Sequence, residues 1–304
     1  MVTSRRYYGI DDYHAISAFI HALYRPYNRD GNWLQPIWAY MHSHPNLDWG
    51  ALGRIRIWED HGHIVAVAHY EMALGEAFFQ VHPDYAALKP DLLDYAIAEL
   101  ASVEPDGSRS LRAFISDFDT DFTRRAASLG FTRDPGNDRT LSVLETPAGF
   151  APDLRLPEGY RLISLAEDND LAKMHRVLWR GFDHAGEPPV EGIVWRKQMQ
   201  SSPFFRPDLT LAVEAPNGDW ASFCGMWFEA PNRIALVEPV ATDPVYRRLG
   251  LGRAVVLEGV RRCAALGARL AFVGSDQAFY HALGFKTASV SQAWSRRSRA
   301  DGGP

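Results

Sequence analysis

The most restrictive feature of this sequence is that its two halves repeat the same order of predicted elements. Each half has alternating apolar segments typical of strands, a turn that begins near a proline, a helix, a further strand and a short helix ending in Leu-Gly-Phe. The turn reads Val81-His-Pro-Asp-Tyr in the first half and Thr242-Asp-Pro-Val-Tyr in the second. A repeat at half the chain length predicts two α/β domains of one kind, with two unrelated α/β domains as the alternative.

The predicted elements follow from apolar periodicity and turn residues. In the first half we predict a helix at 13–24, a hairpin of 55–58 with 63–71, a strand at 76–81, a helix at 90–101, a strand at 111–116 and a short helix at 122–129. In the second half we predict strands at 160–165, 209–215, 220–230, 233–242, 270–274 and 285–294, and helices at 168–179, 190–200, 252–265 and 277–283.

A boundary between the halves is predicted where prolines and glycines gather. The segment 146–159 contains three prolines and two glycines. Such residues interrupt regular structure and are typical of linkers. We therefore predict domains at residues 1–148 and 149–304.

Composition limits the class of protein. With 46% hydrophobic and 23% charged residues, the chain can bury a large core. It has no apolar run near the ~20 residues that span a membrane, and no apolar leader at its start. Cys224 and Cys263 both lie in apolar segments, which predicts two buried thiols rather than a disulfide or metal site. These features predict a cytoplasmic protein that binds neither membrane nor metal.

The distribution of charge favours a compact anionic ligand. The net charge is −5, yet the second half holds a local group of basic residues, Arg247, Arg248, Arg253, Arg261 and Arg262. Binding to nucleic acid would favour a broad basic face instead. We therefore expect a small anion and no nucleic acid.

The strongest local motif lies inside that basic group. The segment Arg247-Arg248-Leu249-Gly250-Leu251-Gly252 follows a predicted strand and begins a long helix. Unpaired N–H groups and the helix dipole make a helix N-terminus a binding site for anions. Gly250 and Gly252 permit close backbone approach, and Arg247, Arg248 and Arg253 add positive charge. The pattern predicts a phosphate or pyrophosphate cradle, although it has neither the Walker nor the dinucleotide-binding spacing.

This segment resembles the pyrophosphate loop Q/R-x-x-G-x-G/A of the GNAT superfamily of N-acetyltransferases. The resemblance covers about residues 159–294 and includes the terminal Phe279-Tyr280-His-Ala-Leu-Gly-Phe element. It implies tandem GNAT-like domains, each with a mixed, mostly antiparallel central sheet flanked by helices. It also implies acetyl-CoA as acyl donor, bound by Val240, Ala241, Thr242, Arg247, Arg248, Leu249, Gly250, Leu251, Gly252 and Arg253. Pro239 and Pro244 would interrupt strand pairing and so admit the cofactor.

Two side chains are candidates for proton transfer. An alkyl amine with a pKa near about 10 must lose a proton to attack a thioester. Glu238 lies on the predicted cofactor strand and is our candidate for the general base, with a structural carboxylate as the alternative. By the resemblance, Tyr280 would protonate the departing thiolate, with core packing as its alternative, and the Val240 N–H would be the oxyanion donor.

The first half has lost this motif. Aligning the halves through Pro83 and Pro244 sets Lys89 opposite Gly250, Asp91 opposite Gly252 and Ala77 opposite Glu238. Aligning the Leu-Gly-Phe ends sets Ala126 opposite Tyr280. An acid and a missing glycine both disfavour a diphosphate. We therefore predict that the first domain is degenerate and non-catalytic.

Together these features predict an acetyl-CoA-dependent N-acetyltransferase that acts on a primary amine of a small molecule. Three alternatives remain: an acyltransferase for longer acyl-CoA, one for a peptide amine, and a non-catalytic acyl-CoA sensor. The chain could be a monomer or a homodimer. The acceptor cannot be identified from the sequence because loops form its pocket.

Overall fold

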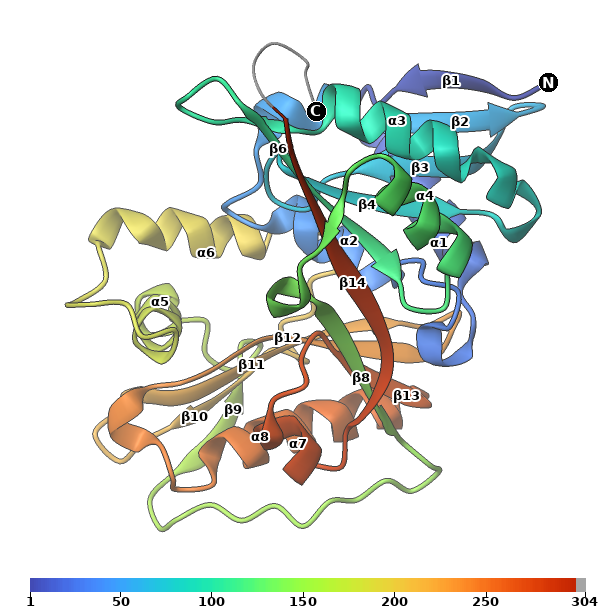
Figure 1. The fold of residues 1–304 in the computed structure, drawn as a ribbon. Helices are drawn as coiled ribbons and strands as arrows, with labels where there is room; N and C mark the ends of the chain where they lie inside the picture. Colours follow the sequence, from blue (N-terminus) through green and yellow to red (C-terminus); the bar gives the residue numbers. More distant parts are fainter. Residues whose placement is uncertain (299–304) are drawn as a thin grey trace. The chain divides into compact units, whose positions relative to one another are not determined.

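The computed structural model describes residues 1–298, and contacts within it divide the chain into two compact units (Figure 1). Unit 1 comprises Met1–Met41, Asn46–Leu141 and the segment that begins at Thr287. Unit 2 comprises His42–Pro45 and Ser142–Lys286. No helix among the described residues is both long and apolar enough to cross a membrane.

The sheet of unit 1 is mixed and mostly antiparallel. Its strand order is β1-β2-β3-β4-β6-β14, in which only β4 and β6 are parallel, and two short strands, β5 and β7, pair with β6 and β14. The strands are β1 Thr3–Arg6, β2 Arg56–Asp60, β3 His63–His69, β4 Glu76–Val81, β5 Ser102–Val103, β6 Arg109–Ser116, β7 Thr132–Arg133 and β14 Lys286–Ser298.

Helices cover this sheet and complete the core of unit 1. They are α1 Ile10–Leu23, α2 Gln35–Ser43, α3 Lys89–Glu99 and α4 Thr120–Ser128. Helices α1 and α3 both contact β3, a strand with five consecutive buried residues. Because a strand covered on both faces cannot alternate with polar residues, β3 reads as a continuous apolar run.

The sheet of unit 2 has the order β8-β13-β12-β11-β10-β9, in which only β12 and β13 are parallel. Its strands are β8 Arg139–Glu145, whose last four residues pair with β13, β9 Arg161–Ser164, β10 Leu211–Glu214, β11 Trp220–Glu229, β12 Ile234–Thr242 and β13 Leu270–Val273. Its helices are α5 Leu171–Gly181, α6 Ile193–Met199, α7 Leu251–Ala265 and α8 Ala278–Ala282.

Helices α5 and α7 pack on β11 and β12 from opposite sides (Figure 1). Asp170 begins α5 by accepting hydrogen bonds from the N–H groups of Ala172 and Lys173. Gly259 lets α7 approach the sheet, since a Cβ there would lie 2.7 Å from Met226 Cγ. Both helices are therefore fixed tightly against the strand that borders the site described below.

The sequence predicted the main elements to within a few residues, but it did not predict α2, β1 or β8. It also predicted the last strand, here β14, as part of a domain 149–304. In the structure β14 pairs with β6 in unit 1, whereas Ser142–Glu145 of β8 pair with β13 in unit 2. Each sheet thus takes a strand from the other half of the chain. An alternating pattern identifies a strand without identifying its partner, and so could not reveal this exchange.

Candidate active site

A cleft of about 930 Å³ lies beside β12 in unit 2. The parallel pairing of β12 with β13 ends at Leu236, so the rest of β12 lies free of β13. The Asp243 N–H bonds to Ala221 O at the β11 side. Backbone groups alternate in direction along an antiparallel strand, so the N–H and C=O of Val240 and Thr242 point away from β11. Both residues line the cleft.

A β-bulge in β12 occurs at the proline where the sequence predicted interrupted pairing. Cys224 lies opposite Val240 and Met226 opposite Val237, so Gly225 faces both Glu238 and Pro239. A Cβ on Gly225 would lie 2.4 Å from Glu238 O, and no side chain fits there. The bulge leaves Glu238 half-buried and lining the cleft.

The loop after β12 leads directly into the N-terminus of α7. Gly250 precedes the helix with a left-handed φ of 79°, and Arg248 also has a left-handed φ, of 68°. The first turn of any helix leaves N–H groups without partners inside the helix. A Cβ on Gly252 would lie 3.1 Å from Thr242 Oγ1 and 3.3 Å from Phe279 Cζ. The open N–H groups and this tight glycine fit an anionic group such as a pyrophosphate.

The five arginines of the basic group have different surroundings. Arg248 and Arg253 are exposed, line the cleft and make no ion pair among the described residues. Arg261 and Arg262 are held by the buried carboxylate of Glu258 at 2.7 and 2.9 Å, and they do not line the cleft. Of this group only Arg247, Arg248 and Arg253, the three predicted as ligands, line the cleft, because Glu258 lies one helical turn before the other two and pairs with both.

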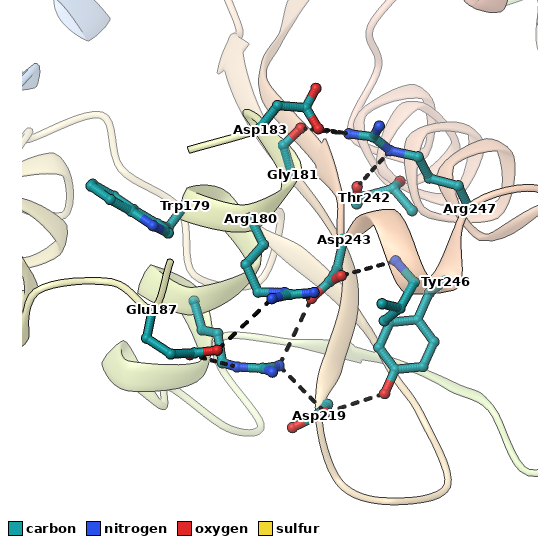
Figure 2. Close-up of polar contacts among 12 residues, drawn as sticks. Trp179, Arg180, Gly181, Asp183, Glu187, Asp219, Thr242, Asp243, Tyr246 and Arg247 are labelled. Carbon is teal, nitrogen blue, oxygen red and sulfur yellow. Dashed lines mark hydrogen bonds and ion pairs between the residues drawn. The ribbon is translucent and has the colours of Figure 1, made fainter. Parts of the chain in front are cut away.

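Arg247 connects the loop to the end of α5 (Figure 2). Its guanidinium donates to Thr242 O at 3.3 Å, to Gly181 O at 3.1 Å and to Asp183 Oδ1 at 2.9 Å. The helix end lies close to β12, since a Cβ on Gly181 would be 2.6 Å from Ala241 Cβ. Arg247 is thus committed to contacts within the protein.

A buried carboxylate holds the same helix to the end of β12. Asp243 is fully buried, and its Oδ2 accepts from Arg180 Nε on α5 at 2.6 Å. Its Oδ1 accepts from the Val245 N–H at 3.1 Å and so begins the 3-10 turn Pro244–Tyr246. The hydrogen bond to Asp243 raises the pKa of Arg180 above its ordinary value. Around this pair Arg176 contacts Asp219 at 3.4 Å and Glu187 at 3.4 Å.

The proposed acid, Tyr280, faces the same cleft as Glu238. Its side chain lies on α8, is 8% exposed and packs against the rings of Phe279 and Phe285. Burial, with smaller effects from Cys224 and Glu238, raises the pKa of the Tyr280 hydroxyl well above its usual value. The group is therefore a neutral hydroxyl at physiological pH and has a proton to give.

The comparisons with known proteins agree with this geometry. Residues 171–285 match the sequence model of the family described as Acetyltransferase (GNAT) family. This part of the chain is a GNAT acetyltransferase domain. Acetyl-CoA is the acyl donor of that family.

Curated relatives and solved structures extend the likeness. The chain is 26% identical over 205 residues to the mycothiol acetyltransferase of Kineococcus radiotolerans, a match covering 64% of each chain and thus under two thirds of the relative. It is 28% identical to that of Thermobispora bispora, covering 65% of this chain and 69% of the relative.

Two solved structures, each 16% identical with a TM-score of 0.66, show the fold. They are a GCN5-related N-acetyltransferase from Sphaerobacter thermophilus, covering 98% of this chain and 96% of that one, and a tandem GNAT protein of the clavulanic acid biosynthesis pathway, covering 100% and 99%.

The cleft of the GNAT domain brings together every site residue predicted from sequence except one. Leu249 is 42% exposed and lies outside the cleft lining. Two parts of the cleft were not predicted from the sequence: the wall formed by Gly181, Phe182 and Asp183, and the side formed by Ser275, Gln277 and Phe279. A glycine at the end of a helix was the only local signal for the wall. Its close approach to β12 depends on tertiary packing.

Cys224 and Cys263 are buried free thiols, as predicted. Burial raises the pKa of Cys263 to about 12, which leaves that thiol protonated and unreactive. Among residues 1–298 no group of three or more His, Cys, Asp or Glu side chains is arranged to hold a metal ion.

Proposed function

We propose that the GNAT domain is an acetyl-CoA-dependent N-acetyltransferase that acts on a primary amine of a small molecule. The observation that carries the proposal is the shape of the cleft. A strand edge at Val240 and Thr242 that faces away from β11 continues into a glycine-lined helix N-terminus beside Arg248 and Arg253, which make no ion pair among the described residues. A strand edge suits the amides of a pantetheine arm, and a helix N-terminus suits a pyrophosphate.

Each part of the cleft then has one task. Val240, Ala241 and Thr242 hold the pantetheine, and Arg248, Gly250, Leu251, Gly252 and Arg253 surround the pyrophosphate. Arg247, predicted as a cofactor ligand, contributes mainly by holding the loop to α5. The bound acyl-CoA supplies the acyl group as a thioester.

Glu238 and Tyr280 would move the protons. Glu238 accepts the proton of the attacking amine, directly or through a water molecule, while the Val240 N–H donates to the thioester carbonyl oxygen. Tyr280 gives its proton to the departing sulfur, so that the products are an amide and a free thiol. The place of Tyr280 in the lining of the cleft, which Glu238 also lines, supports this role.

Calorimetric titration with acetyl-CoA tests the cofactor assignment, and lack of binding at millimolar concentration would refute it. Gly252→Asp should abolish binding, because it sets a carboxylate beside Thr242 and Phe279 where the cradle is tightest. Release of free thiol from acetyl-CoA in the presence of an amine panel tests the reaction. Since two relatives are named mycothiol acetyltransferase, the panel includes amines related to mycothiol.

The same panel separates the alternatives. Acyl-CoA donors of increasing chain length, and peptides with a free N-terminus, would release thiol if a longer acyl chain or a peptide amine were used. Tight acetyl-CoA binding without turnover on any amine would favour an acyl-CoA sensor.

A further inference from the structure

Unit 1 has its own opening between parallel strands, at the place that corresponds to the cleft of the GNAT domain. Strands β4 and β6 pair only at Glu76 with Arg112 and at Ala77 with Ala113. Beyond this, β4 leads through the 3-10 turn Pro83–Leu88 into α3, as β12 leads into α7. The repeated turn sequence sets Val81 in the position of Thr242.

The backbone of Val81 is already occupied by a side chain. The His82 N–H bonds to Val65 O on the β3 side, so the Val81 N–H and C=O point to the open side of β4. Asn32 Oδ1 accepts from the Val81 N–H at 2.7 Å, and Asn32 Nδ2 donates to Val81 O at 3.2 Å. The side-chain amide of Asn32 therefore satisfies both the N–H and the C=O of Val81, as the backbone of a neighbouring strand would.

The segment Asp30–Trp33, which carries Asn32, contacts both separated strands. Gly31 lies against the end of β6, where a Cβ would be 2.8 Å from Ser116 Cβ. The Trp33 N–H donates to Gln80 Oε1 on β4 at 2.6 Å. Asn32 itself is 4% exposed. The remaining cavity is about 260 Å³, against about 930 Å³ for the cleft of the GNAT domain.

The N-terminus of α3, at one end of this cavity, lacks the features that would bind a phosphate. Leu88, which precedes α3, has ordinary right-handed geometry with a φ of −77°, where Gly250 has a left-handed one. Lys89 lies at the start of α3, but its ammonium group is paired with Asp119. The cation that could meet a pyrophosphate already has a carboxylate partner.

We propose that the segment Asp30–Trp33 is a built-in substitute for the pantetheine arm and closes unit 1 to acyl-CoA. Asn32 makes to the backbone of Val81 the hydrogen bonds that an amide of acyl-CoA would make to the backbone of Thr242. The comparison with Thr242 rests on the proposed function. The chain then binds one acyl-CoA, and unit 1 keeps its opening filled in every state of the enzyme.

Binding stoichiometry of the full chain is the first test. Calorimetry with acetyl-CoA should give one equivalent for the wild type and none for Gly252→Asp, which alters only the loop in unit 2. One equivalent bound by Gly252→Asp would show that unit 1 takes the cofactor and would overturn the proposal. No binding by the wild type would instead refute the proposed function and leave the inference to the second test.

Hydrogen exchange measured by mass spectrometry is the second test. The peptide with Val81 should be protected without ligand and unchanged by acetyl-CoA, whereas the peptide with Thr242 should gain protection. Asn32→Ala should speed exchange at Val81 about tenfold, since a buried N–H loses its acceptor. The surface control Asn137→Ala, whose side chain bonds only Asp134, should not change it. Equal exchange at Val81 in both variants would overturn the proposal.

Discussion

Replacing Asp243 by asparagine tests how the cofactor loop is held. The two carboxylate oxygens of Asp243 accept from different donors, Arg180 Nε at 2.6 Å and the Val245 N–H at 3.1 Å. An asparagine amide has only one oxygen. One donor would therefore face an NH2 group inside a site that is closed to solvent.

The cost can be estimated from these contacts. A hydrogen bond to a charged group contributes about 1.5–3 kcal/mol. Breaking a fully buried ion pair costs about 3–5 kcal/mol. Arg180 is 24% exposed and keeps Glu187 at 3.8 Å, so it is not stranded. We expect Asp243→Asn to lower the free energy of unfolding of unit 2 by about 2–3 kcal/mol. Loss of the cap on the 3-10 turn should raise the Kd for acetyl-CoA by about fivefold to tenfold.

Urea unfolding followed by circular dichroism measures the free energy of unfolding, and the transition of unit 2 is the one that added acetyl-CoA moves to higher urea. Calorimetry measures the Kd for acetyl-CoA. Asp219→Asn is the matched control. Its carboxylate is 38% exposed, contacts Arg176 at 3.4 Å and accepts from the Tyr246 hydroxyl at 3.2 Å and Asn217 Nδ2 at 3.0 Å, contacts open to solvent, so the loss should stay below about 1 kcal/mol. If both variants unfold alike and bind acetyl-CoA as the wild type does, Asp243 does not hold the loop.

Four further predictions follow from the same geometry. Glu238→Gln should lower kcat about 100-fold, flatten its rise with pH and leave acetyl-CoA affinity within about twofold; an unchanged pH–rate profile would exclude Glu238 as the base. Tyr280→Phe keeps the packing but removes the proton, so kcat should fall about tenfold or more without loss of stability, and unaltered turnover would make Tyr280 a core residue only. Arg253→Gln should weaken acetyl-CoA binding and reduce its dependence on salt, whereas Arg261→Gln, on the same helix but paired with Glu258, should do neither; equal effects in a salt titration would contradict the separation of the two arginines. Burial and then Arg196 lower the pKa of His44 to about 4, so the folded chain excludes a proton that the unfolded chain binds. Stability should therefore fall as pH decreases from about 6.5 to about 4, by about 2 kcal/mol at pH 5; urea titrations of His44→Gln that keep the full slope would contradict this.

The sequence could predict those parts of the candidate site whose chemistry depends on residues close together in the chain. A glycine two residues before another at a helix start, with arginines beside them, predicts an anion cradle from local order alone. Glu238 was readable because an acid in an apolar strand is uncommon. The repeat of the turn at Val81 and Thr242 was likewise sufficient to suggest two related units.

Contacts between distant segments were not readable. Nothing local in Asp30–Trp33 indicates that Asn32 binds the backbone of Val81, forty-nine positions later. The pairing of Arg180 with Asp243 joins a helix to a strand end sixty-three positions away. Such pairs arise from packing, since many polar side chains could reach an acceptor in an unfolded chain.

The sequence by itself therefore determined the kind of elements and their order, and it predicted the chemistry of the cradle, because these depend on spacing of three to seven residues. Tertiary structure decided which strands complete each sheet, which arginines remain available to a ligand and which of the two openings contains the segment Asp30–Trp33. Those outcomes depend on the direction of backbone groups at strand edges and on the close approach that glycines such as Gly181 and Gly225 permit. Only the folded chain brings both sides of such a contact together.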